Sequence, residues 1–396
     1  MSQQDAASAG PVSGQVPGQV PGQVPGQVPG QGKDERLKEA SFILRLMRRP
    51  ELGAVMGLVI VTVFFIMVAS ATMFEFSGIM NFLAPAAQLG ILAIGASLLM
   101  VGGEFDLSVG SMVAFTGLIF AACVVTMGLP LPLAIVITLA FAAAMGLLNG
   151  QIVIHTGLPS FIVTLAFLFI LRGFSLVGLK WATGGSTQLR GVREAATTTG
   201  LDSFFYGIFA GDAFEGLFAW LAENDLLAKF PNGQPKVTGI PVEIIWFALI
   251  AILAAWVLTR TRYGNWIFAS GGDPDAARNS GVPVRRVKTS LFMVTACCAA
   301  LVAILTVLDS GSTDARRGFQ KEFEAIIAAV IGGCLLTGGY GSAVGAAIGA
   351  VIFGMVLIGL TYTTIDQDWY LVFLGAMLLM AVFFNNIIRK RVTGER

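Results

Sequence analysis

The chain has 396 residues, of which 55% are hydrophobic and only 12% are charged, and its mean hydropathy is +0.78. Soluble globular domains carry about twice that share of charged residues, so the composition excludes that class. The formal net charge of +1 gives no indication of nucleic-acid binding, and we expect no nucleic-acid partner.

Residues 1–32 open the chain with a repeated GQVP motif. Glycine and proline at this density cannot bury a core, so we expect a disordered arm. The arm lacks the charged and then apolar layout of a cleavable signal peptide, so the first membrane span is expected to stay as an anchor. A basic segment follows over residues 33–50, and we expect it at the cytoplasmic surface, with an amphipathic interfacial helix at 37–47.

Apolar segments, most of them long enough to cross about 30 Å of hydrocarbon as helices, then follow one another to the C-terminus. This pattern predicts an all-α, polytopic membrane protein of about ten transmembrane helices, some of them broken, with its membrane domain over residues 51–388. The predicted spans are 51–70, 82–101, 109–127, 131–153, 159–178, 241–259, 289–308, 325–337, 342–362 and 369–388.

With the N-terminus in the cytoplasm, ten spans place the loop 180–240 outside the cell and the loop 260–288 inside, together with the tail 389–396. Cationic residues mark the cytoplasmic side of short loops. They are concentrated in 260–288, namely Arg260, Arg262, Arg278, Arg285, Arg286 and Lys288. Counting and charge therefore predict the same orientation.

The loop 260–288 also carries the signals of one very short helix. Asp273 can cap the first free N–H groups, Pro274 suits the first helical position, and Gly281 suits a left-handed stop. A helix of under two turns is not stable alone, which favours docking on another surface, and a solvated loop is the alternative.

Two polar interruptions divide the apolar pattern. The first, GGEFDLSVGS at 102–111, carries Glu104 and Asp106. It predicts non-helical backbone buried in protein or beside a wet cavity, with an ordinary solvated turn as the alternative. The second, residues 320–349, is rich in glycine, which permits either a broken helix or simply tight helix packing.

Single residues add little chemistry to this pattern. Arg172 lies toward the outer end of a predicted span, and we expect it to snorkel to the interface, with pairing to an acid as the alternative. Lys33 is the only lysine directly after a glycine, and Asp34 follows it, so the chain lacks a phosphate-binding loop. His155 is the only histidine, and the four cysteines show no metal-ligand spacing. We therefore expect no catalytic residue, metal or cofactor in this chain.

Taken together, the motifs resemble permeases of bacterial ABC sugar importers of the ribose/xylose type, in order from about residue 80 to 388. The resemblance is carried by GGEFDLSVGS, Asn149-Gly150, the segment 159–165, Arg172-Gly173, Gly271-Gly272, residues 276–278 and 280–282, Val287-Lys288, Glu322, residues 324–326, Gly332-Gly333 and residues 338–341.

This resemblance implies an ABC importer permease fold that works as a homodimeric or heterodimeric membrane core. Its implied partners are cytoplasmic ATPase subunits, a periplasmic sugar-binding protein, membrane lipid and a small-molecule sugar. The short helix then resembles the coupling helix that docks on the ATPase, and its coupling residues would be Asp273, Ala276, Ala277, Arg278 and Gly281. Candidates for the substrate pathway are Glu104, Asp106, Ser108, Asn149, Glu322 and Glu324.

The chain departs from the family pattern at Glu104-Phe105, where Gly-Gly-Ile is common before Asp-Leu-Ser. If the break is extended, Glu104 and Asp106 point the same way and can line the path. We expect Asp106 to hold the loop by accepting backbone N–H bonds and Glu104 to tune substrate choice. A polyol or nucleoside is an alternative cargo, and an ion-coupled secondary transporter is an alternative class. A membrane enzyme has little chemistry to support it.

Overall fold

The computed structural model describes residues 51–230 and 232–393. The expected arm 1–32, the basic segment 33–50 and the last three residues of the expected tail lie outside this part of the chain. Within it the secondary structure is almost all helical, with two short two-stranded sheets. The predicted all-α, polytopic class is confirmed.

Eight helical segments of the described chain are long and apolar enough to cross a membrane. They are α2 (Glu51–Val68), α3 (Phe76–Val101), α4 (Val109–Ala121) with the π-helical turn η3 (Ala122–Thr126), α5 (Leu131–Thr156), α6 (Ser160–Thr183), α10 (Val242–Arg260), α13 (Val284–Ser310) and α15 (Ala343–Gly359) with η4 (Leu360–Tyr362).

The other two predicted spans also fall on helices. One is α14 (Lys321–Ile331), whose 11 residues are too few to cross the hydrocarbon layer alone. The other is α16 (Trp369–Thr393), in which residues Trp369–Met380 are apolar. The predicted span 325–337 was too long, because α14 ends at Ile331, and α14 is the half-length element that the glycine-rich segment allowed.

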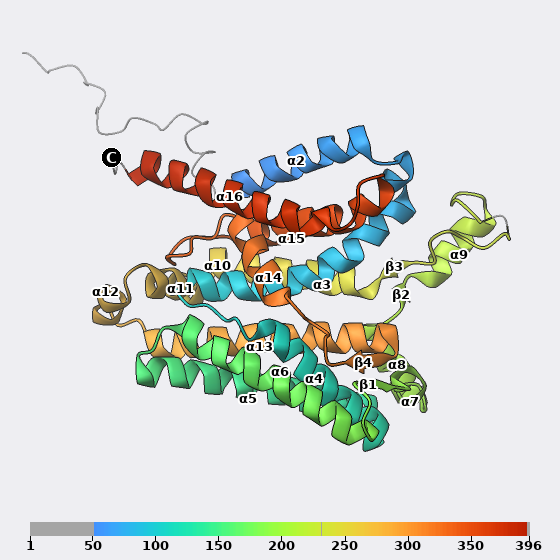
Figure 1. The fold of residues 1–396 in the computed structure, drawn as a ribbon, viewed down its shortest axis with the longest axis horizontal. Coiled ribbons are helices and arrows are strands. Elements are labelled where there is room, and N and C mark those ends of the chain that lie inside the picture. The colour runs from blue at the N-terminus through green and yellow to red at the C-terminus, as the bar shows by residue number, and fades with distance from the viewer. Residues whose placement is uncertain (1–50, 231, 394–396) are drawn as a thin grey trace, which may run out of the picture. The chain divides into compact units, whose positions relative to one another are not determined.

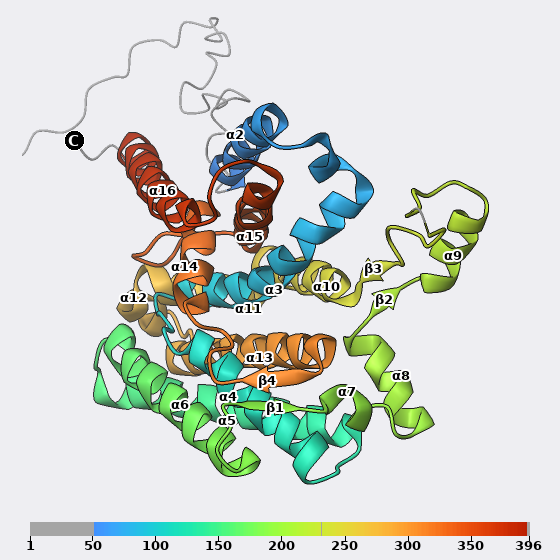
Figure 2. The same ribbon diagram turned by 45° about the vertical axis from the view of Figure 1, so that its right-hand side comes forward.

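The long helices separate into inner and outer ones. In the most apolar 18-residue stretch of α13, 83% of the residues are buried, whereas in that of α2 only 11% are. Most residues in the corresponding stretches of α3, α4 and α15 are also buried. Figures 1 and 2 show α3, α13 and α14 between α5 and α6 on one side and α2 and α16 on the other. Small residues permit this inner packing: a Cβ on Gly95 of α3 would lie only 3.2 Å from the Cβ of Cys298 on α13.

One end of the helices carries α11 (Arg262–Gly272) and α12 (Pro274–Asn279), and we refer to it as the α12 end (Figure 1, left). The sequence predicted α12 but not α11, which begins where the Thr261 hydroxyl caps the N–H of Gly264 at 3.1 Å. The next span also starts earlier than the predicted residue 289, at Val284.

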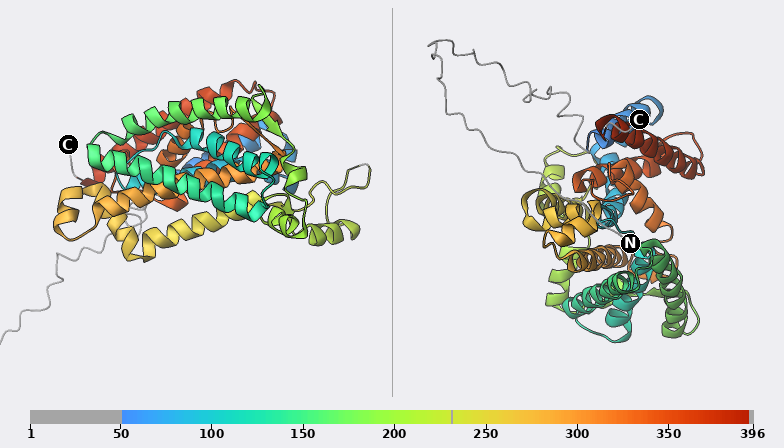
Figure 3. Two further views of the ribbon diagram at one scale, coloured as in Figure 1. Left: turned by 90° about the horizontal axis from the view of Figure 1, so that it is seen from below. Right: turned by 90° about the vertical axis from the view of Figure 1, so that its left-hand side faces the viewer.

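The opposite end, here the α9 end, holds the long connection that was expected as a loop. Within the connection lie β1 (Gln188–Arg190), α7 (Val192–Ala195), α8 (Gly200–Phe209), β2 (Asp212–Ala213), α9 (Glu215–Glu223) and, at its end, β3 (Ile240–Pro241). The same end of the molecule also holds η2 (Ala71–Phe74) and β4 (Ser312–Asp314). β1 pairs with β4 and β2 with β3, both antiparallel, with Leu189 opposite Thr313 and Asp212 opposite Pro241. Figure 3 shows the two ends from below and along the helices.

Candidate functional site

The break between α3 and α4 has the expected non-helical backbone. α3 ends at Val101. The N–H of Gly102, its C-cap, still reaches the Leu98 carbonyl at 3.1 Å, and Gly103 takes a left-handed φ of +81°. A positive φ of this size suits glycine because a Cβ would crowd the neighbouring carbonyl. The chain then runs without helix as far as Ser108, the residue before α4 begins at Val109.

Asp106 holds the second half of this break. Its Oδ1 accepts the Ser108 N–H at 2.8 Å and the Ser108 hydroxyl at 2.5 Å, and the residue is 5% exposed. Ser108 in turn accepts a hydrogen bond of 3.1 Å from the Asn149 amide on α5. The other side-chain atom of that amide, Oδ1, is buried and has no hydrogen-bond partner among the described residues.

Two hydroxyls of α6 complete the support of the break. Ser160 accepts the Phe105 N–H and Thr164 accepts the Leu107 N–H, each at 3.0 Å. Ser160 and Thr164 lie one helical turn apart, so they meet alternate residues of an extended segment. Sequence reasoning did not assign them this role, although two hydroxyls spaced by four in an apolar helix are a signal that could have identified it.

Glu104 has a partner that the sequence did not indicate. Its Oε1 accepts a 2.6 Å hydrogen bond from Nζ of Lys288 on α13, and the two side chains are only 13% and 14% exposed. Asp106 binds Ser108 instead, so the two acids have separate partners. The place of Glu104 and Asp106 in the substrate pathway stays a prediction.

The second interruption connects α14 to α15 through residues 332–342. Gly333, Gly338 and Gly339 have left-handed φ values of +91°, +81° and +71°. Ser342 caps α15 by accepting the Gly345 N–H at 3.3 Å. The two helices pack closely, because a Cβ on Gly332 would lie only 2.6 Å from the Cα of Ala346. The broken helix, one of the two alternatives, is what the chain forms.

Three backbone segments from distant parts of the chain meet without intervening side chains. The Gly339 N–H donates to the Val101 carbonyl at 2.9 Å, and a Cβ on Gly338 would lie 2.7 Å from Cα of Gly103 and from the Gly271 oxygen. We call this contact the glycine junction and define it by Gly102, Gly103, Gly271, Gly272, Gly338 and Gly339. Since Gly272 directly precedes the α12 cap, the junction connects α12 to both interruptions.

Charged groups gather where α4 and α14 begin. A Cβ on Gly110 would clash with Oε2 of Glu322, a buried oxygen without a hydrogen-bond partner among the described residues. Glu324, two residues on, accepts a 2.6 Å hydrogen bond from Lys321. Both glutamates are nearly buried, at 4% and 9% exposure.

Arg172 joins the same region, and the expectation that it snorkels to the interface was wrong. Its guanidinium donates to the carbonyls of Arg317 and Gly318 at 3.0 and 3.4 Å and lies 5.7 Å from the Phe319 ring centre. The span was predicted to end at residue 178, but α6 continues to Thr183, which moves Arg172 toward the middle of the helix. There a guanidinium needs protein acceptors rather than water.

At the α12 end, the short helix has the predicted caps. Asp273 accepts the N–H groups of Asp275 and Ala276 at 3.1 and 3.0 Å, and Gly281 has a φ of +84°. Ala277 is buried and anchors the helix, whereas Ala276 and Arg278 are exposed. Within the described residues, no group of three or more His, Cys, Asp or Glu side chains could hold a metal ion.

Comparisons with known proteins agree with this architecture. The model of the family described as "Branched-chain amino acid transport system / permease component" matches residues 78–382. The xylose transport system permease protein XylH of Escherichia coli (strain K12) is 30% identical over 360 residues, covering 85% of this chain and 91% of that protein. The ribose import permease protein RbsC of the same strain is 32% identical over 318 residues, covering 80% and 88%. The galactose/methyl galactoside import permease protein MglC of Haemophilus influenzae is 28% identical over 319 residues, covering 78% and 85%.

Proposed function

This chain belongs to the family of permease components described for the branched-chain amino acid transport system, and on that premise we propose that it is the membrane subunit of an ATP-driven monosaccharide importer. The cargo class is supported by relatives named for xylose, ribose and galactose transport. The chain itself encodes no phosphate-binding loop, so ATP hydrolysis is assigned to a partner subunit.

We place the α12 end in the cytoplasm and the α9 end outside. The cations of 260–288 lie at the α12 end, as expected for a short cytoplasmic loop. α12 is then the element on which the ATPase docks, with Asp273 and Gly281 defining its ends, Ala277 holding it, and Ala276 and Arg278 presented to the partner. Short capped helices transmit movement as rigid bodies.

The glycine junction is the observation that carries the proposal, because it provides a route from α12 to the membrane interior. A displacement of α12 moves Gly271 and Gly272, which touch the break after α3 and the segment before α15. Backbone contacts at this distance are not compressible, so both interruptions must respond. The chain would alternate between inward- and outward-open states, biased by ATP hydrolysis on the partner.

The start of α4 is the proposed contact with the sugar. Two buried oxygens without a hydrogen-bond partner among the described residues lie near it: Oδ1 of Asn149, whose amide nitrogen binds Ser108, and Oε2 of Glu322, which lies against Gly110. Sugar hydroxyls are hydrogen-bond donors and fit such acceptors. Asp106 and Glu324 are assigned to holding this region, since each already binds a neighbour. Glu104 is assigned to the link with Lys288.

The remaining proposed partners follow from the orientation. A binding protein would deliver the sugar at the α9 end, and a second permease subunit would complete the membrane core.

Reconstitution in proteoliposomes tests the function directly. The chain is combined with a candidate ATPase subunit and a candidate sugar-binding protein, and uptake of labelled pentoses and hexoses is measured with ATP or a non-hydrolysable analogue inside. We expect uptake only with ATP, the ATPase and the binding protein present. Uptake that needs no ATPase and collapses with a protonophore would overturn the proposal in favour of an ion-coupled transporter. Uptake of only a polyol or nucleoside would correct the cargo.

A further inference from the structure

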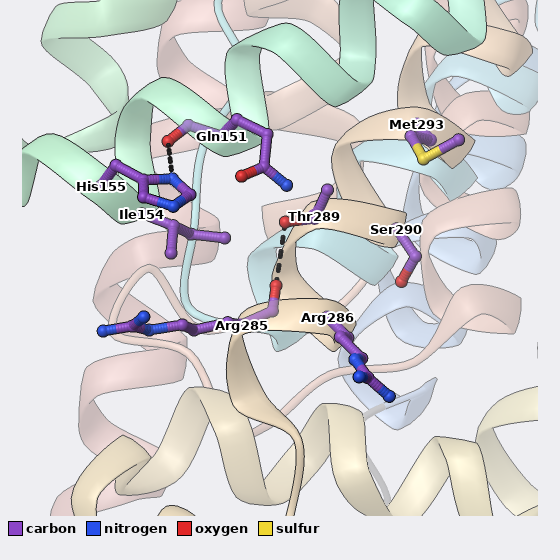
Figure 4. Close-up of a pocket in the computed structure, with 8 residues that line it drawn as sticks. All are labelled: Gln151, Ile154, His155, Arg285, Arg286, Thr289, Ser290 and Met293. Carbon is purple, nitrogen blue, oxygen red and sulfur yellow. Dashed lines mark hydrogen bonds between the residues drawn. The ribbon is translucent and has the colours of Figure 1, made fainter.

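A cavity of about 380 Å³ lies between α5 and α13 at the α12 end and has no part in the proposed sugar path. Its lining residues are Gln151, Ile154, His155, Arg285, Arg286, Thr289, Ser290 and Met293, which Figure 4 shows. We propose that this cavity binds the phosphate headgroup of an anionic phospholipid from the cytoplasmic leaflet. The inference rests on the orientation given in the proposed function.

The cavity arises from a change in side-chain size along α5. At Gly146 and Gly150 the two helices nearly touch, since a Cβ there would lie 2.6 Å from Cα of Met293 and 3.0 Å from Cα of Thr289. Beyond these glycines the larger Gln151 and His155 face the beginning of α13, and the helices no longer fill the space between them. The hollow is therefore a property of the helix pair and not of a loose surface loop.

The cavity carries uncompensated positive charge. Arg285 and Arg286 are exposed, and neither makes an ion pair with any residue that the structure describes. The neighbouring cations differ, because Lys288 pairs with Glu104 and Arg278 with Asp275. The remaining lining side chains contain no carboxylate, so an anion entering the cavity meets donors only from guanidinium, amide, hydroxyl and imidazole groups. Guanidinium groups match phosphate oxygens in geometry as well as charge.

The walls favour a lipid over a soluble anion. Ile154 and Met293 line the cavity beside the charged groups, so it offers an apolar wall as well as donors. Farther along, α5 exposes Leu147 and Leu148 and α13 exposes Val294, each by about 40%, as helices facing acyl chains do. A ligand with a phosphate at one end and hydrocarbon at the other fits both the cationic lining and the apolar wall of the cavity. Basic pockets between transmembrane helices on the cytoplasmic side are known sites for such headgroups.

The test compares lipid binding by the purified full chain and its variants. Detergent-solubilised protein is titrated with phosphatidylglycerol or phosphatidylcholine, and bound lipid is counted by native mass spectrometry. The cavity variant is Arg285→Gln with Arg286→Gln, and the control is Arg262→Gln, an exposed arginine on α11 at the same end of the molecule. Each cavity cation contributes roughly fivefold in affinity near an anionic headgroup, so the double variant is expected to bind phosphatidylglycerol about 25-fold more weakly. The control should keep wild-type binding, and phosphatidylcholine binding should be the same in all three proteins.

Three results would overturn the proposal. They are unchanged phosphatidylglycerol binding in the double variant, displacement of the lipid by millimolar inorganic phosphate, and a loss of ATPase co-purification in the double variant without any change in lipid binding. The second identifies a free-phosphate site and the third an ATPase contact. Lipid counting needs neither sugar nor ATP, so the lipid-binding proposal can fail while the proposed transport function holds. The transport function can likewise fail while lipid binding is observed.

Discussion

Lys288 at the start of α13 and Glu104 in the break after α3 form an ion pair of 2.6 Å although 184 positions separate them in the chain. Both side chains are mostly buried, so removing one leaves a charge with neither water nor partner. Breaking such a pair typically costs about 3–5 kcal/mol, whereas replacing both groups is far less costly.

Glu104→Gln and Lys288→Gln are therefore each expected to lower thermal stability markedly, and the double variant is expected to recover most of the loss. A double-mutant cycle from thermal unfolding in detergent measures the coupling. The exposed pair Asp275–Arg278 is the matched control, with an expected coupling below about 1 kcal/mol. Equal coupling free energies for the two pairs would show that the burial of Glu104 and Lys288 does not strengthen their interaction.

The glycine junction predicts opposite outcomes for two adjacent glycines. A Cβ on Gly271 would lie 2.8 Å from the Gly339 nitrogen, whereas one on Gly272 would make an ordinary contact at 4.0 Å from the Gly339 Cα. Overpacking of this kind costs about 1–3 kcal/mol or shifts the backbone. Gly271→Ala is expected to reduce sugar uptake per ATP hydrolysed, and Gly272→Ala to leave it near the wild-type value. If both variants transport the same amount of sugar per ATP hydrolysed, the glycine junction does not transmit the movement of α12.

Gly281 predicts how α12 must end. Its φ of +84° is unfavourable for a β-branched side chain, although no atom lies within 4 Å of a Cβ placed there. Gly281→Val is expected to disturb the helix end and reduce ATPase co-purification, and Gly281→Asn to retain it because asparagine tolerates this conformation. Arg278→Glu should also reduce co-purification by reversing an exposed charge. Wild-type recovery of the ATPase with Gly281→Val and with Arg278→Glu would exclude α12 as the docking helix.

Asp106 predicts a loss that does not depend on the cargo. Asp106→Ala removes the acceptor of the Ser108 N–H and hydroxyl and leaves buried donors unsatisfied, at a cost of about 1–3 kcal/mol. Uptake of every sugar is expected to fall together. Asp106→Asn keeps one acceptor and should be milder. A change in sugar preference with normal stability would instead place Asp106 in direct contact with the cargo.

Asp202 predicts a dependence of stability on pH. Hydrogen bonds from Thr199 and from the Leu131 N–H hold the pKa of its carboxyl below the ordinary value of 3.8. Because the folded-state pKa is depressed, the stabilisation is present above the unfolded value and is lost as pH falls through the folded one. Asp202→Asn replaces one acceptor by a donor and should lower the melting temperature at pH 7.

The same difference in melting temperature is expected to shrink as the pH falls below the unfolded-state pKa of 3.8 and to disappear below the lower folded-state pKa, where the wild-type carboxyl is protonated in both states. Glu194→Gln, an exposed change at the same α9 end, serves as the control and should show little effect at either pH. A difference that stays constant with pH would mean that the charge of Asp202 is not involved.

The sequence by itself determined the features that depend on a few neighbouring residues. Runs of apolar residues predicted the eight helices that are long enough to cross a membrane, together with α16, because each run must satisfy its own backbone hydrogen bonds in lipid. Asp273, Pro274 and Gly281 predicted α12 to within about a residue, since capping acts within one helical turn. The glycines of 102–111 and 320–349 predicted where regular helix is interrupted.

Tertiary structure alone decided which distant groups meet. The pairing of Glu104 with Lys288, the attachment of Arg172 to Arg317 145 positions away, and the contact of Gly271 with Gly338 depend on how whole helices pack. No local pattern encodes these partners, because a side chain's free energy in the membrane interior depends on which neighbour satisfies it. Both acids of the first interruption were visible in the sequence. Packing brought the cation of Lys288 to Glu104, whereas Asp106 binds Ser108, its neighbour two residues along the chain, and the two acids so have separate roles.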